Sequence, residues 1–180
     1  MALSIKEMDE NIPNTSVPSG GKGLALRNDE YITEPAKWSG QEITYEEIVA
    51  DVTISATVEA SADTIISTDS IEYDGNPILI EFFAPRVTPF DSDTALVAIT
   101  LWQDTTDMGR IWLSATVAAM NAGPSGVYAA RRLTPSKGPH VYSVRGFRTV
   151  GSGVVNAGGG GAGNHIPAFI RITRAGRQSP

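Results

Sequence analysis

Residues that could carry out catalysis are few in this chain of 180 residues, and they lie far apart. The two histidines, His140 and His165, each fall at the edge of a strand-like run, and the chain contains no cysteine, which excludes thiolate catalysis and cysteine-based zinc sites. The hydrolase signatures G-x-S-x-G and H-E-x-x-H do not occur, and the Ser-x-x-Lys match at residues 19–22 contains two glycines and is typical of a loop. We therefore expect no enzyme and no catalytic residue.

Acidic residues offer a second kind of chemistry. Asp91 with Asp93, and Asp104 with Asp107, place hard oxygen donors close together, as calcium loops do, but neither segment has the EF-hand spacing. Turns recruit aspartate for local hydrogen bonds as well. A glycosidase needs one particular pair of carboxylates, and nothing in the spacing of the 20 acidic residues selects a pair. We expect no metal and no cofactor, with calcium as the open alternative.

The glycine-rich segment 151–164 matches a nucleotide-binding pattern only in its spacing. Gly158, Gly160 and Gly163 satisfy G-x-G-x-x-G. That motif holds a pyrophosphate because a helix N-terminus follows it, whereas Pro167 here leads into an alternating, strand-like sequence. We reject a dinucleotide site and expect a tight hairpin or a close backbone approach at a symmetry axis.

The elements that would position any site read as β-strands. From about residue 50 the apolar residues recur with period two, beginning at Val52, and turn sequences such as Asp-Gly-Asn-Pro at 74–77 separate the runs. Because no ten-residue helical period lies between them, these runs predict an all-β fold, an antiparallel jelly-roll sandwich. After the first run, strands are expected at about 64–67, 77–83, 94–103, 109–117, 126–133, 139–148 and 167–174.

Two of the predicted strands, 77–83 and 94–103, are apolar on both faces. A two-layer sandwich buries one face of each sheet, so the second face needs the N-terminal segment, a loop or another subunit to cover it. We favour another subunit. In the last strand, Ala168, Ile170 and Ile172 are expected in the core, and Phe169 at a subunit contact.

Residues 1–47 differ from the rest, because prolines and glycines interrupt every periodic run. Capping-box matches at 4–7 and 44–47 allow short helical turns. We divide the chain into an extended N-terminal attachment arm, 1–47, and a jelly-roll domain, 48–180. The apolar residues of the arm either fold back on their own domain or dock on a neighbour. These candidate attachment residues are Ile12, Val17, Leu24, Leu26, Tyr31 and Trp38.

Charge is divided sharply along the chain. The first 107 residues carry all 20 carboxylates and five basic residues, a net charge of −15, and the remainder carries nine basic residues, a net charge of +9. The two halves either neutralise each other within the fold, which we favour, or face different partners. The overall charge of −6 argues against nucleic acid as a partner, and no stretch is long and apolar enough for a membrane span or a signal peptide. We expect a soluble protein made in the cytosol.

The C-terminal third resembles a known group of proteins. The segment Thr-Pro-Ser-Lys-Gly-Pro-His-Val-Tyr-Ser-Val-Arg-Gly-Phe-Arg at 134–148, the glycine tract, Asn164, and Pro-Ala-Phe-Ile-Arg-Ile-Thr-Arg at 167–174 resemble tailed-bacteriophage virion proteins with a jelly roll like that of tumour necrosis factor or C1q. The resemblance covers about the last 50 residues well and residues 50–174 loosely, the latter through the turn at 73–75, the apolar strand at 78–83 and the pair at 109–110.

This resemblance implies a homotrimer on the virion. It supplies no catalytic residues, and the chain lacks the repeats and heptads of a long fibre. We therefore expect a trimeric capsid decoration or cementing protein on the capsid exterior, assembled in the host cytoplasm and bound to the major capsid protein or another virion protein. The alternative is a receptor- or carbohydrate-binding module at a tail tip or fibre, with Trp102 and Trp112 as platform candidates, although both fall inside predicted strands, where we favour core or interface packing. The expected trimer-interface residues are Phe83, Trp112, Phe147, Phe169 and Arg171.

Overall fold

The computed structural model describes residues 40–90, 94–117 and 125–175. Contacts divide the chain into two units, Met1–Lys37 and Trp38–Pro180, and every described residue belongs to the second unit. Twelve strands and one short 3-10 helix make up this part of the chain. They are β1 (Glu42–Ile48), β2 (Val52–Ile54), η3 (Glu59–Ser61), β3 (Asp63–Ser67), β4 (Ile71–Asp74), β5 (Ile78–Phe90), β6 (Thr94–Gln103), β7 (Thr106–Val117), β8 (Ser125–Leu133), β9 (Lys137–His140), β10 (Tyr142–Val150), β11 (Ser152–Asn156) and β12 (Ala168–Arg174).

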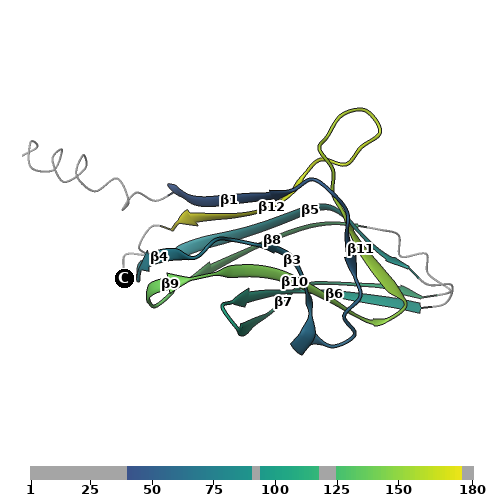
Figure 1. Cartoon of the computed structure of the whole chain (residues 1–180), viewed down its shortest axis with the longest axis horizontal. Coiled ribbons are helices and arrows are strands. Elements are labelled where there is room, and N and C mark those ends of the chain that lie inside the picture. The colour runs from purple at the N-terminus through teal and green to yellow at the C-terminus, as the bar shows by residue number, and fades with distance from the viewer. Residues whose placement is uncertain (1–39, 91–93, 118–124, 176–180) are drawn as a thin grey trace, which may run out of the picture. The chain divides into compact units, whose positions relative to one another are not determined.

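The strands form two antiparallel sheets and a short ribbon. The first sheet runs β1-β12-β5, with β8 on the other edge of β5, and β11 and β2 continue it along the second half of β5. The second sheet runs β3-β10-β6-β7, and β4 pairs with β9. Figure 1 shows β1, β12, β5 and β8 in one layer and β10, β6 and β7 in the other.

The order in which the chain visits these sheets is that of a jelly roll. The main strands alternate between layers: β1 in the first, β3 in the second, β5 in the first, β6 and β7 in the second, β8 in the first, β10 in the second and β12 in the first. The first and last strands are neighbours. Eight antiparallel strands arranged in this way define the double-sheet jelly roll, so the predicted fold class is confirmed.

The core lies between the two sheets and follows the period-two pattern. Ala168, Ile170 and Ile172 of β12 are fully buried, as predicted, and they belong to one apolar cluster with Val97 and Ile99 of β6. Burial of a large aliphatic side chain stabilises a fold by about 1.5–3 kcal/mol. Alternation in β12 and β5 is therefore enough to define an inner face and an outer face for the first sheet.

The boundary between arm and domain differs from the prediction. Residues 44–47 match a capping box but form part of β1, which pairs with β12 from Glu42 to Ile48. The jelly roll therefore begins before Glu42, not at residue 48. A four-residue capping match is weak, and the cross-strand pairing to β12 overrides it because it satisfies the backbone along the whole segment.

The second apolar face of β6 is covered by the chain itself, which corrects the expectation that another subunit would cover it. Ala98 and Phe147 are buried with Ala62, in the segment that follows η3, and the guanidinium of Arg145 lies 4.3 Å above the ring of Trp102. A loop and a neighbouring strand thus complete this side of the sandwich. The second face of β5 instead carries Glu81 and the half-buried ring of Phe83.

Other strands besides β1 were missed or misjudged in the sequence. The alternation at 52–58 yields only the three-residue β2, because the chain turns away into η3. The ribbon strand β4 and the glycine-containing β11 were not predicted. Gly153 of β11 is required sterically, since a Cβ there would lie 2.4 Å from Val97. The backbone of β11 therefore lies close to the second sheet of the same chain, whereas the predicted close approach was one at a symmetry axis.

Candidate subunit interface

Aromatic side chains gather on the outer face of the first sheet. Phe169 of β12 lies opposite Phe83 of β5, and Phe83 lies opposite Tyr128 of β8. The rings of Phe83 and Phe169 are stacked with centroids 5.5 Å apart, and Tyr45 of β1 lies 5.3 Å from Phe169. We call Tyr45, Phe83, Tyr128 and Phe169, together with Glu81 and Arg171, the aromatic face.

No element in the described part of the chain covers this face. Tyr128 is 64 % exposed and Tyr45 is 40 % exposed, and Phe83 and Phe169 are half-buried. Offset and tilted ring pairs at this spacing contribute about 0.5–1.5 kcal/mol beyond their area. A row of partly and fully exposed rings across four strands is typical of an interaction surface. A partner that covers the rings removes apolar surface from water, which lowers the free energy.

A buried carboxylate lies within the aromatic face. Glu81 is only 7 % exposed, and it accepts a hydrogen bond of 2.5 Å from the hydroxyl of Tyr128 and one of 2.9 Å from Nε of Arg171. The Tyr128 hydroxyl, followed by the Arg171 guanidinium, holds the pKa of Glu81 below its usual range. Glu81 therefore stays ionised at neutral pH and joins β5, β8 and β12 on their outer side.

Tyr45 completes the polar part of the same surface at its edge. Its hydroxyl donates a 2.5 Å hydrogen bond to Oε1 of Glu47, and this bond is the main cause that raises the pKa of Tyr45 to about 12. The ring is thereby held against Phe169 rather than free to rotate into solvent. A preorganised aromatic surface loses less side-chain entropy when a partner binds.

Three of the five predicted interface residues come together here. Phe83, Phe169 and Arg171 all lie on the aromatic face. Phe147 does not: it is 3 % exposed, packs with Ala98 in the core and lies beneath the guanidinium of Arg110. Trp112 of β7 is also elsewhere, half-buried against the main core. The pairing of Phe147 with Ala98 turns Phe147 to the outer side of the second sheet, whereas the pairing of Trp112 with Ile99 turns Trp112 toward the main core.

Tyr45, Tyr128 and Glu81 were missed as members of this face. Tyr128 alternates with Val127 and Ala129, so period two could have placed it on the outside of β8. Tyr45 was hidden by the helical interpretation of 44–47. Glu81 interrupts an apolar alternation, and a single charge in such a position is a signal for a satisfied ion pair.

The six predicted attachment residues, Ile12, Val17, Leu24, Leu26, Tyr31 and Trp38, all lie outside the described residues. The calcium candidates Asp91 and Asp93 lie outside them as well. Asp104 and Asp107 are used as turn acceptors, since Asp104 accepts the amide of Val141 and Asp107 that of Gly109. Among the described ranges, no cluster of three or more His, Cys, Asp or Glu side chains is placed to hold a metal.

Ser136, His140 and Asp104 form a hydrogen-bonded series with the composition of a catalytic triad. Nε2 of His140 lies 2.8 Å from Oγ of Ser136, and Nδ1 lies 2.8 Å from Oδ2 of Asp104. The main-chain oxygen of Ser136 is also 3.2 Å from Nε2. The side-chain nitrogen of Gln103 lies 3.1 Å from Nδ1 as well, so each ring nitrogen has two polar neighbours. The arrangement ties β9 to the turn after β6.

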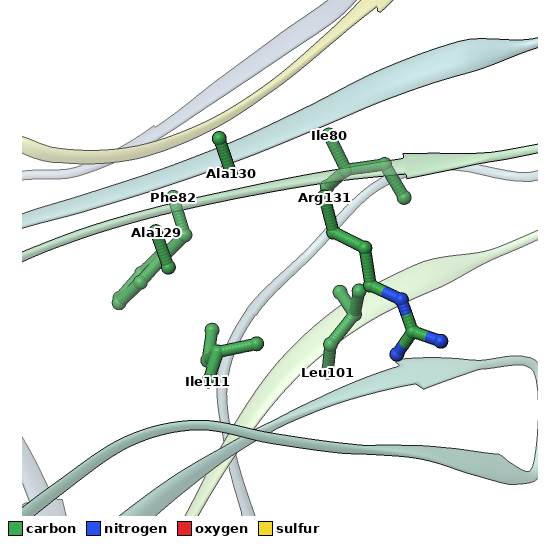
Figure 2. A pocket seen from close by; sticks show the side chains of 7 residues that line it. All are labelled: Ile80, Phe82, Leu101, Ile111, Ala129, Ala130 and Arg131. Atoms are coloured by element: carbon green, nitrogen blue, oxygen red, sulfur yellow. The ribbon is translucent and has the colours of Figure 1, made fainter.

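A small apolar notch opens between the two sheets. Ile80 and Phe82 of β5, Leu101 of β6 and Ile111 of β7 line it, and Figure 2 shows Arg131 of β8 reaching across it. The guanidinium of Arg131 donates to the carbonyl of Met108 in β7. The notch holds about 10 Å³, no more than a single water needs, so it offers no room for an organic ligand.

Acidic residues from the first part of the chain pair with basic residues from the remainder within the fold. Between described residues, three ion pairs each join a carboxylate from the first 107 residues to an arginine from the remainder. They are Glu59–Arg110, Glu81–Arg171 and Asp74–Arg174, and Asp104 also contacts His140. Mutual neutralisation, the interpretation that we favoured, is therefore seen directly at these sites.

Comparisons with known proteins add little beyond the fold. No protein-family model matches the sequence, and no curated protein matches it. Among solved structures, the chain is similar to the structure of Eiger TNF from S. frugiperda, with 12 % identity, a TM-score of 0.32, and coverage of 75 % of this chain and 98 % of that chain. At this level the likeness supports no functional conclusion. No helix in the described ranges has the length and hydrophobicity that crossing a bilayer requires.

Proposed function

We propose that this protein is a structural protein of a tailed-bacteriophage virion, a homotrimer that decorates or cements the capsid exterior. The observation that carries the proposal is the aromatic face: a row of half-buried and exposed rings on the outer side of β1, β12, β5 and β8, without a covering element from the described part of its chain. Self-association is the simplest use of such a surface in a jelly roll, since each copy supplies both partners.

The virion assignment rests on the resemblance of residues 134–148 and 164–174 to phage proteins of this kind. In this proposal the jelly rolls trimerise, and each trimer presents three N-terminal arms to the major capsid protein or another virion protein. Three weak attachments then multiply through their effective concentration. Neither catalysis, a cofactor, nucleic acid nor a membrane is required.

A second candidate is a receptor- or carbohydrate-binding module at a tail tip or fibre. Trp102 is 7 % exposed and covered by Arg145, so it cannot serve as a platform. Tyr128 and Tyr45 favour this alternative more, because exposed rings beside hydrogen-bonding groups also suit a sugar. Glycan binding by the full chain that disappears in Tyr128→Ala, in a protein that stays monomeric, would favour this candidate.

The experiment that tests the proposal compares two substitutions on opposite sheets. Phe169→Asp places a charge on the aromatic face, and Leu113→Asp, at a residue that is 52 % exposed on β7, is the matched control. Sedimentation velocity of the full chain should show a trimer that Phe169→Asp weakens about tenfold or more and that Leu113→Asp leaves intact. A clean monomer at micromolar concentration contradicts the trimer.

Attachment is tested on undecorated particles. The full chain should saturate them, and a chain that begins at Gly40 should assemble but no longer bind. If the shortened chain still saturates the particles, the arm is not the attachment element. If neither chain binds any shell, the capsid assignment is wrong while the trimer stands.

A further inference from the structure

On the aromatic face, the carboxylate that contacts Arg171 is that of Glu81, and this carboxylate can be protonated. Glu81 is 7 % exposed, yet Arg171 beside it has a side chain that is 42 % exposed, and Tyr128 is 64 % exposed. In the single chain, water therefore still reaches the guanidinium and solvates it. Covering the face with a second copy would remove that water.

The cost of burying this group depends on the protonation of Glu81. With Glu81 ionised, the pair is neutral overall, and Oε2 accepts from Arg171 at 2.8 Å while Oε1 accepts from Tyr128 at 2.5 Å. With Glu81 protonated, a net positive charge is enclosed in the interface. Burying an unpaired charge is far more costly than burying a hydrogen-bonded pair.

We propose that the assembly formed through the aromatic face is released by acid, because protonation of Glu81 removes the negative charge that contacts Arg171 directly in the interface. This inference rests on the proposed function, since it concerns the regulation of the same surface. It makes Glu81 the group that decides whether the copies stay together as the pH falls.

The groups around Glu81 give the direction of the effect. Tyr128 of β8 and Arg171 of β12 both favour the carboxylate and hold the pKa of Glu81 below its ordinary value of 4.5. From β1, Tyr45 lies opposite Arg171, and the carboxylate of Glu42 adds negative charge near Arg171. Because the assembly would enclose a net charge on protonation, the pKa of Glu81 is lower in the assembly than in the free protomer. Association is thus favoured above the free-protomer pKa and lost as the pH falls through the assembled-state pKa.

The test follows the sedimentation of the full chain from pH 7 to about pH 3, with near-ultraviolet circular dichroism to confirm that the protomers stay folded. The wild type should dissociate into folded protomers. Glu81→Gln, which mimics the protonated group, should associate about tenfold or more weakly at pH 7. The double variant Glu81→Met with Arg171→Met removes both charges and should associate at pH 7 and remain associated in acid.

Tyr128→Phe gives an independent measurement if the double variant does not fold. Because this variant lacks the hydroxyl that donates to Glu81, its assembly should dissociate at a higher pH than that of the wild type. The inference is overturned if the double variant dissociates at the same pH as the wild type, or if Glu81→Gln assembles as tightly as the wild type at pH 7. A wild type that is monomeric at pH 7 refutes the proposed trimer and this inference together, whereas a wild type that assembles and resists acid refutes only this inference.

Discussion

At the scale of single residues, adjacent side chains in one strand have different roles. Ile170 and Phe169 follow each other in β12, and alternation sends the first into the core and the second onto the aromatic face. The stability of the fold and the affinity between copies therefore depend on separate side chains. Substitutions at these two positions should separate the two properties.

Ile170→Ala should lower the free energy of unfolding by about 2–5 kcal/mol, because it removes a fully buried side chain and leaves a cavity. Phe169→Ala should lower it by less than half as much, since the ring is only half-buried. Urea denaturation of both variants under conditions where the chain is monomeric measures the difference. Equal losses would place Phe169 in the core and contradict the assignment of faces.

His140 should behave as a structural residue. His140→Ala removes the contacts to Asp104 and Ser136 and should lower the free energy of unfolding by about 1–2 kcal/mol. The wild-type chain should not react with a fluorophosphonate probe, which labels activated serines. Labelling that is lost in both Ser136→Ala and His140→Ala would show that the series is a catalytic triad after all.

At the scale of elements, one carboxylate organises the segment that covers the second sheet. Oδ2 of Asp63, at the start of β3, accepts the amides of Ser55 and Ala56 at 2.6 and 2.7 Å. The hydrogen bond from the backbone amide of Ala56 is the largest of the causes that lower the pKa of Asp63. These bonds fix the bend between β2 and η3 that places Ala62 against Phe147.

Asp63→Asn should therefore destabilise the chain at neutral pH and not in acid. A depressed carboxyl pKa contributes stability above the ordinary pKa of 3.8, and this contribution disappears as the pH falls through the folded-state value. The unfolding free energies of the variant and the wild type should differ at pH 7 and converge near pH 2–3. A constant difference across this range would show that Asp63 acts through packing instead.

At the scale of the whole molecule, the described jelly roll begins with β1. The amide of Gly40 donates to the carbonyl of Arg174 at 2.6 Å, and β1 covers the edge of β12 that would otherwise expose a row of unpaired backbone groups. A chain that begins at Gly40 should keep the thermal midpoint of the full chain within a few degrees. A chain that begins at Val49 should lose stability or aggregate, and equal midpoints for the two would contradict the boundary drawn here.

Salt should have a modest effect on the assembly. The ion pairs Glu59–Arg110 and Asp74–Arg174 lie within one chain, and exposed pairs contribute about 0–1 kcal/mol each. Raising the salt concentration toward 1 M, where the Debye length is about 3 Å, should therefore loosen the trimer only slightly. Sedimentation across this range measures the change. Release of an intact trimer from the particle at high salt would instead show that charges face the virion.

The amino-acid sequence by itself determined the all-β class and the inner face of the last strand. Period-two alternation and turn residues are local patterns, which can be recognised without knowing which strands pair. It also placed Phe83, Phe169 and Arg171 at one surface. Tertiary structure alone decided that β1 belongs to the sheet, that Phe147 is core, and that Tyr45, Tyr128 and Glu81 complete the aromatic face. These outcomes depend on strand register, which brings together residues as far apart in the sequence as Tyr45 and Phe169. No local pattern encodes that pairing, because cross-strand contacts are chosen by the packing of the whole sandwich.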